Sequence, residues 1–127
     1  MRSLSLRDAF EPRPTATVLM AQNDPAMAQA LWNDLQAHFD GVVVAENASE
    51  VRPLLLRHPG VRMAVLDLEV VNLEDVRELT HTFSDLIIVC THRSPDDRMW
   101  TAALAAGAVE YCHPDDIRAI LRAQAAA

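Results

Sequence analysis

Five short apolar runs alternate with amphipathic stretches from residue 15 onward, and this alternation limits the fold more than any other feature. The runs are rich in Val, Ile, Leu or Ala and lack strict polar alternation, which is typical of strands buried on both faces of a parallel sheet. The expected strands are 15–21 (TATVLMA), 42–45 (VVVA), 63–66 (MAVL), 86–90 (LIIVC) and 109–112 (VEYC).

The stretches between these strands carry residues that commonly begin helices. Asp24 and Ser94 each offer an N-cap side chain and are each followed by proline, which suits the first helical position. Asn72, Ser49 and the segment 113–116 are expected to begin the other helices, with acidic side chains near their positive ends.

Three glycines punctuate the chain between an expected helix and the next strand. We expect a positive φ at Gly41, Gly60 and Gly107. Each connection has room for one helix, and crossovers between parallel strands are right-handed. The sequence therefore predicts a doubly wound α/β domain of three layers, in which helices cover both faces of the sheet.

The length of 127 residues suits one domain. We expect a mobile leader over 1–14, the folded domain over 15–125 and a fraying tail over 126–127. The leader has no apolar core like that of a secretory signal, and no run approaches the ~18–20 residues of a transmembrane helix. Cys90 and Cys112 do not make a disulfide framework, so we expect buried, reduced thiols in the cytoplasm rather than a redox switch.

The charge of the chain is strongly acidic. All 11 basic residues are arginine, and 18 acidic residues bring the net charge to −7. A surface of this charge repels nucleic acids and anionic membranes, so we expect neither as a direct partner. The lack of lysine also removes one common cation from any phosphate-binding site.

Polar residues follow four of the expected strands at the point where each strand ends. Because the carboxyl ends of parallel strands meet at one edge of the sheet, we expect these side chains to lie together. They are Gln22, Asn23, Asp24, Asp67, Glu69, Thr91, His92 and His113.

Four segments resemble the corresponding segments of response regulator receiver domains, and the resemblance covers about residues 15–125. It implies a flavodoxin-like (βα)5 sandwich with the strand order 2-1-3-4-5. The four segments are VLMAQNDP, AVLDLE, IIVCTHRS and AAGAVEY.

The resemblance also assigns roles to residues. It implies that Asp67 accepts a phosphoryl group from a histidine kinase, next to a magnesium ion held by acidic residues after the first strand. It implies that Thr91 follows the phosphoryl oxygens and that Tyr111 is the aromatic residue that moves when the domain switches.

The sequence departs from the family at the positions that handle charge. The acidic pair after the first strand is replaced by Gln22 and Asn23, and Asp24 occupies a less essential position. The family's lysine has no counterpart, and its place falls on Pro114 or on His113.

The pocket therefore loses most of its charge. The family's pocket holds three carboxylates and one ammonium group, whereas Asp67 would be flanked here by amides. Magnesium needs carboxylate charge to offset its dehydration, and phosphoryl transfer needs cations on the phosphoryl oxygens. We expect no resident metal; magnesium is at most a weak ligand, with Asp24, Asp67 and Glu69 as weak candidates. The proline and glycine that normally follow the acceptor are also replaced, by Val71 and Asp75.

We interpret the chain as a degenerate receiver that signals by protein–protein contact and is not an enzyme. One alternative is a conventional receiver phosphorylated on Asp67, in which Asp24 or Glu69 supplies the missing carboxylate. A second is a small flavodoxin-like binder of a ligand or cofactor, for which three unclustered glycines offer no phosphate cradle. A plainer interpretation of Asp67 is a buried, hydrogen-bonded residue that holds its loop.

The resemblance also identifies an output face. In receiver domains this face, which also serves for dimerisation, is formed by the fourth helix, the fifth strand and the last helix. Met99, Trp100 and Leu104 fall on that helix and Tyr111 on that strand, and Trp100 is either a core residue or an anchor for a partner. We expect protein partners, namely a histidine kinase or a downstream signalling protein, and a homodimer through this face is a further option.

Overall fold

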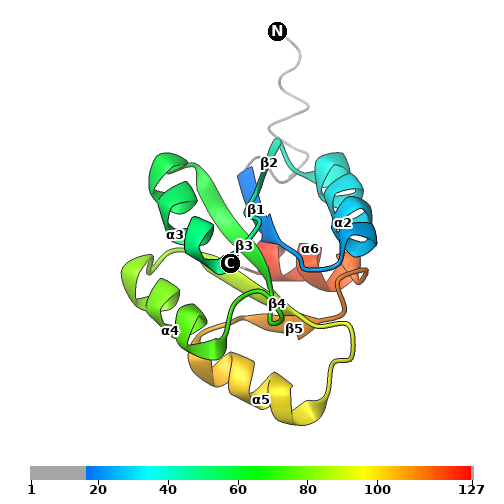
Figure 1. The fold of residues 1–127 in the computed structure, drawn as a ribbon, viewed down its shortest axis with the longest axis vertical. Coiled ribbons are helices and arrows are strands. Elements are labelled where there is room, and N and C mark those ends of the chain that lie inside the picture. Colours follow the sequence, from blue (N-terminus) through cyan, green and yellow to red (C-terminus); the bar gives the residue numbers. More distant parts are fainter. Residues whose placement is uncertain (1–16, 127) are drawn as a thin grey trace, which may run out of the picture.

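The computed structural model describes residues 17–126 of the chain (Figure 1). The expected leader, the first two residues of the expected first strand and residue 127 lie outside the described residues. The ten elements are β1 (Thr17–Ala21), α2 (Pro25–His38), β2 (Gly41–Val44), α3 (Ala48–Arg57), β3 (Val61–Asp67), α4 (Leu73–Thr82), β4 (Ile87–Thr91), α5 (Asp97–Ala106), β5 (Glu110–Cys112) and α6 (Ile117–Ala125).

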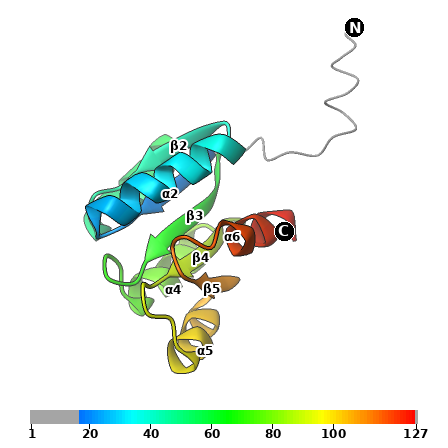
Figure 2. The same ribbon diagram turned by 90° about the vertical axis from the view of Figure 1, so that its right-hand side faces the viewer.

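The strands form one parallel sheet in the order β2-β1-β3-β4-β5, which confirms the predicted architecture. Helices α2 and α6 cover one face of this sheet, and α3, α4 and α5 cover the other (Figures 1 and 2). Alternate residues of each strand therefore pack into two separate hydrophobic clusters, one on each face of the sheet. Leu19 of β1, for example, belongs to one cluster and Met20 to the other. No described helix is long and apolar enough to cross a membrane.

Two predicted helix starts are confirmed by their caps. The Asp24 carboxylate accepts hydrogen bonds from the backbone N–H groups of Ala26 and Met27, at 2.9 and 3.0 Å. The Asn72 side chain accepts from the N–H of Asp75, and the Asp75 carboxylate accepts from the N–H of Asn72. This reciprocal pair satisfies two backbone groups that the first turn leaves without partners.

Two other predicted starts are wrong by two residues. Helix α3 is capped by Asn47, and the Ser49 hydroxyl donates to the Asn47 side chain instead of capping the helix. Helix α5 is capped by Asp96, whose carboxylate accepts from the N–H of Met99 at 2.8 Å. Ser94 stays in the loop, where its N–H donates to the His92 ring.

The last helix, α6, begins after the cap residue Asp116, at the end of the expected segment 113–116. The helix runs to Ala125, and Ala123 near its end is buried. The glycine prediction is right at one position among the described residues. Gly107 has a φ of 119°, whereas neither Gly41, which begins β2, nor Gly60 has a positive φ.

Candidate functional site

The candidate site is a row of polar side chains across three neighbouring strands. Asp67 and Thr91 are register partners on β3 and β4. Ala21 pairs with Leu66 on β1 and β3, so Gln22 lies beside Asp67 on the other side. Parallel register keeps neighbouring side chains on the same face, so the sheet itself brings these three residues together.

Asp67 ends β3 and is only 1% exposed. One carboxylate oxygen accepts from the N–H of Asn23, and the other accepts from the N–H of Glu69, both at 3.0 Å. Its backbone carbonyl accepts from the N–H groups of Val70 and Val71, which shapes the following loop. Charge-assisted hydrogen bonds to backbone donors satisfy a buried carboxylate without a metal ion.

Two buried donors beside Asp67 have no hydrogen-bond partner among the described residues. They are the amide nitrogen Nε2 of Gln22 and the hydroxyl Oγ1 of Thr91. The Gln22 carbonyl oxygen is turned to the backbone and accepts from the N–H of Asp24 at 3.3 Å. The Asn23 side chain is exposed, and the hydrogen bond that Asn23 makes to Asp67 comes from its backbone N–H.

The remaining carboxylates near the site are engaged elsewhere. Asp24 caps α2, and Glu69 binds the Arg93 guanidinium at 3.1 and 3.2 Å. The His92 ring lies 3.9 Å from the same Glu69 oxygen. Nothing in the sequence singled out Arg93, because its role depends on two loops that meet only in the folded chain.

The donor set is therefore poor for magnesium. Among the described residues Asp67 is the one buried carboxylate, and amide and hydroxyl groups flank it. Over residues 17–126 no group of three or more His, Cys, Asp or Glu side chains is arranged to hold a metal ion. Magnesium would have to lose hydration without the carboxylate charge that normally offsets this cost.

The positions assigned to the missing lysine carry no free cation directed at Asp67. Pro114 is buried, and the His113 ring faces Asp115, with Nδ1 at 2.7 Å from a carboxylate oxygen. An imidazole held by its own loop is a weak substitute for an extended ammonium group.

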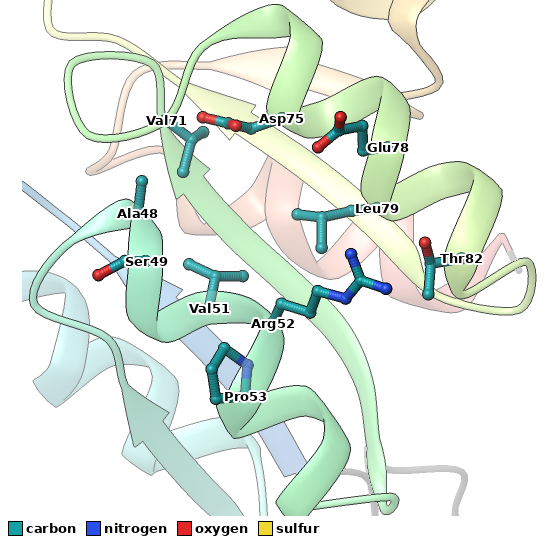
Figure 3. Close-up of a pocket in the computed structure, with 10 residues that line it drawn as sticks. All are labelled: Ala48, Ser49, Val51, Arg52, Pro53, Val71, Asp75, Glu78, Leu79 and Thr82. Carbon is teal, nitrogen blue, oxygen red and sulfur yellow. The ribbon is translucent and has the colours of Figure 1, made fainter.

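A separate groove of about 340 Å³ lies between α3 and α4. Figure 3 shows Val51 and Leu79 approaching from the two helices, with the Arg52 side chain reaching toward α4. Val71 and Asp75, the residues at the family's proline and glycine positions, line the same groove. The groove does not include Asp67, but Val71 donates its N–H to the Asp67 carbonyl.

The sequence matches no protein-family model and no curated protein. Solved structures are more informative. HP1043, an orphan response regulator of H. pylori, is 16% identical with a TM-score of 0.74, over 89% of this chain and 98% of that one. A response regulator from Thermotoga maritima is 22% identical with a TM-score of 0.73, over 87% and 96% of the two chains. This chain has the receiver fold.

A third similar structure is a complex. The receiver domain of a Saccharomyces cerevisiae response regulator was crystallised with the histidine phosphotransfer protein that acts upstream of it. Its receiver is 18% identical to this chain with a TM-score of 0.74, and the match covers 88% of each chain. Similarity at this level of identity establishes the fold, and function must be argued from the residues.

The surface expected to be the output face, formed by α5, β5 and α6, carries exposed apolar side chains. On α5, Trp100 is 47% exposed and Leu104 is 40% exposed, while Met99 packs against the core. Val109, which directly precedes β5, is 55% exposed. Nothing in the sequence indicated this exposure, because Val109 belongs to the apolar run that predicts the fifth strand. This face therefore offers Trp100 to solvent rather than burying it in the core.

Tyr111 lies inward in the receiver fold and is buried. Its hydroxyl makes no hydrogen bond with the described residues, and burial raises the pKa of the phenol. The backbone N–H of Asp96 lies close enough to moderate that pKa shift. A buried hydroxyl without a partner is destabilising.

The two cysteines of the receiver fold lie on opposite faces of the sheet. Cys90 belongs to the cluster under α3, α4 and α5, and Cys112 to the cluster under α2 and α6. Both are free in this structure and buried, as the sequence predicted for their burial. Burial raises the pKa of each thiol from 9.0 to about 12, with Asp116 and Glu110 adding to the effect at Cys112.

The raised pKa values of the two thiols lead us to expect a loss of stability at alkaline pH. Above pH 9 the unfolded chain releases thiol protons that the folded chain retains up to about pH 12. The unfolded state then binds fewer protons, so the free energy of unfolding falls as the pH rises across this window. In urea unfolding, the midpoint concentration should fall as the pH rises from 8 to 11. In a Cys90→Ala/Cys112→Ala variant the midpoint should depend less steeply on pH. If the midpoint fell equally steeply with pH in both proteins, the buried thiols would not be the cause of the loss of stability.

Proposed function

We propose that this chain is a signal-transduction module of the two-component type that acts by protein–protein contact, with little or no magnesium-dependent phosphorylation of Asp67. The observation that carries the proposal is the state of the Asp67 carboxylate. Both of its oxygens are already satisfied by backbone N–H groups, and the nearby carboxylates of Asp24 and Glu69 have other partners.

The fold and the output face support the signalling role. A receiver fold with Trp100 and Leu104 exposed on α5 has an apolar surface on which a protein partner could dock. The partner that we propose is a histidine kinase, a histidine phosphotransfer protein or a downstream signalling protein. A protein locked in one state could present such a surface constitutively, because it would not depend on a phosphoryl group to expose it.

The second candidate is a conventional receiver, and one observation favours it. The Gln22 amide and the Thr91 hydroxyl are buried donors without partners, one on each side of Asp67. Donors placed in this way could bind the oxygens of a phosphoryl group and so replace part of the missing positive charge.

Phosphorylation by acetyl phosphate with magnesium separates the two candidates. We expect the intact mass of the wild-type chain to stay unchanged and Trp100 emission to stay constant. A Gln22→Asp/Asn23→Asp variant restores two carboxylates and should bind magnesium tighter by on the order of 100-fold, since two charges at ~4 Å interact by a few kcal/mol near a protein surface. It should then gain the mass of one phosphoryl group.

The control is Asp67→Asn in the same background, which should remove any added phosphoryl group. The conventional interpretation would replace ours if the wild-type chain gained the phosphoryl mass and lost it on Asp67→Asn. A restored variant that still binds no magnesium would show that the missing carboxylates are not what limits the site.

A further inference from the structure

Strand β2 is one edge of the sheet, and two of its residues direct backbone groups outward. The N–H of Ala45 donates to the carbonyl of Met20 on β1 at 2.9 Å. Because these groups alternate along a strand, the N–H and C=O of Val43 face β1 as well, whereas those of Val42 and Val44 face away from the sheet.

This edge lacks the features that normally prevent strand pairing. Its sequence, GVVV, contains no charge and no proline, and its register with β1 is continuous. Val44 is 44% exposed, and no described element covers the edge. Uncovered, apolar edge strands are templates for pairing with another strand.

Shallow hollows flank the edge on both faces of the sheet, and Val44 lines each of them. The first is lined by Met20, Pro25, Ala28, Gln29, Trp32 and Val44, on the side of α2. The second is lined by Val44, Ser49, Glu50, Pro53, Leu54 and Arg57, on the side of α3. Side chains of an added strand would point alternately to the two faces and so into these two hollows.

Helix α3 carries opposite charges at its two ends beside β2, so the edges of two antiparallel copies would be complementary in charge. Glu50 lies in the first turn and Arg57 in the last turn, and both line the hollow beside β2. Arg57 has no charged partner among residues 17–126, and one Glu50 oxygen accepts from the N–H of Glu46. A twofold axis at the edge would reverse one α3 relative to the other and place each Glu50 opposite the Arg57 of the second copy.

We propose that β2 pairs antiparallel with β2 of a second copy of this chain and joins the two sheets into one. The axis passes at Val43, so Val42 of each copy pairs with Val44 of the other, and their outward N–H and C=O groups meet. Val43 of each copy then faces its counterpart on the α3 side of the sheet. This contact is separate from the α5–β5 output face and does not depend on the proposed function.

Sedimentation of the full chain over micromolar to near-millimolar concentrations tests the proposal. We expect a monomer–dimer equilibrium that Val44→Lys weakens at least about 10-fold, because each lysine would put a charge against the apolar Val42 of the other copy and the two lysines would lie diagonally across the joined edge. The matched control is Val109→Lys, which puts the same charge at an exposed valine on the output face and should leave the dimer intact. Both variants should behave like wild type with acetyl phosphate, which keeps this test independent of the proposed function.

A charge exchange on α3 tests the register. Glu50→Arg and Arg57→Glu should each weaken the dimer, since each places like charges opposite one another, and the double variant should recover it. A monomer at every concentration, or a dimer broken by Val109→Lys and not by Val44→Lys, would overturn the proposal. So would a full chain that stays monomeric while a chain without residues 1–14 dimerises, because its own N-terminal segment would then occupy the edge.

Discussion

Asp67→Asn is expected to lower the free energy of unfolding by about 2 kcal/mol at pH 7. The wild-type carboxylate accepts one backbone N–H at each oxygen, from Asn23 and Glu69. An asparagine side chain keeps one acceptor and turns an NH₂ group toward the other donor. The change therefore removes one charge-assisted hydrogen bond and leaves a donor facing a donor in a buried site. Urea unfolding of the two proteins at pH 7 measures the difference.

The sign of this effect distinguishes two kinds of pocket. Where several carboxylates crowd together, replacing one by an amide relieves repulsion and stabilises the fold. Asp67 has no second carboxylate among its hydrogen-bond partners, so we expect a loss of stability. Glu69→Gln is the control, because it alters a partly exposed ion pair with Arg93 and the neighbouring contact with His92, and it should change stability by no more than ~1 kcal/mol. A more stable Asp67→Asn protein would show that acidic neighbours do act on the site.

The sequence alone was sufficient to place Asp67 at the carboxyl edge of the sheet. An apolar run of Val and Leu ends directly at Asp67, and another apolar run ends at Thr91. The pairing of β3 with β4 places Thr91 beside Asp67. Such runs, bounded by turn and cap residues, are typical of strands buried on both faces of a parallel sheet. The position of each site residue followed from strand order and needed no side-chain detail.

What the side chains do at that edge was not predictable from the sequence. Asp24 could have faced the pocket, yet the first turn of α2 offers it two nearby N–H donors. Glu69 pairs with Arg93, which is distant in sequence and on another loop. Helix caps and ion pairs between loops compete for the same carboxylates. Which partner each carboxylate binds depends on distances that exist only in the folded chain.

Helix starts show the same competition on a smaller scale. Ser94 and Asp96 are both good caps, and the structure places the Asp96 carboxylate, rather than the Ser94 side chain, at the first turn, where it accepts from the N–H of Met99. Gly41, Gly60 and Gly107 looked equivalent in sequence. The structure separates them, because α5 ends against α4 and only that turn requires a left-handed residue.

Gly107→Ala is expected to cost about 3 kcal/mol of unfolding free energy. Gly107 follows α5 with a φ of 119°, and the N–H groups of Gly107 and Ala108 bond to carbonyls of the last turn. A Cβ at this φ is strained by roughly 1–2 kcal/mol. The same Cβ would collide with the Thr80 side chain on α4, and such overpacking typically costs about 1–3 kcal/mol.

A double-mutant cycle with Thr80→Ala separates the two costs. Removing the Thr80 hydroxyl and methyl groups relieves most of the collision but not the backbone strain, so the double variant should recover only part of the loss. Gly60→Ala is the matched control, because nothing lies within 4 Å of its Cβ position and its φ is not positive. That substitution should leave stability unchanged or slightly raised, since alanine restricts the unfolded chain more than glycine does. Equal losses at Gly60 and Gly107 would mean that neither the left-handed turn nor the contact with Thr80 governs this junction between α4 and α5.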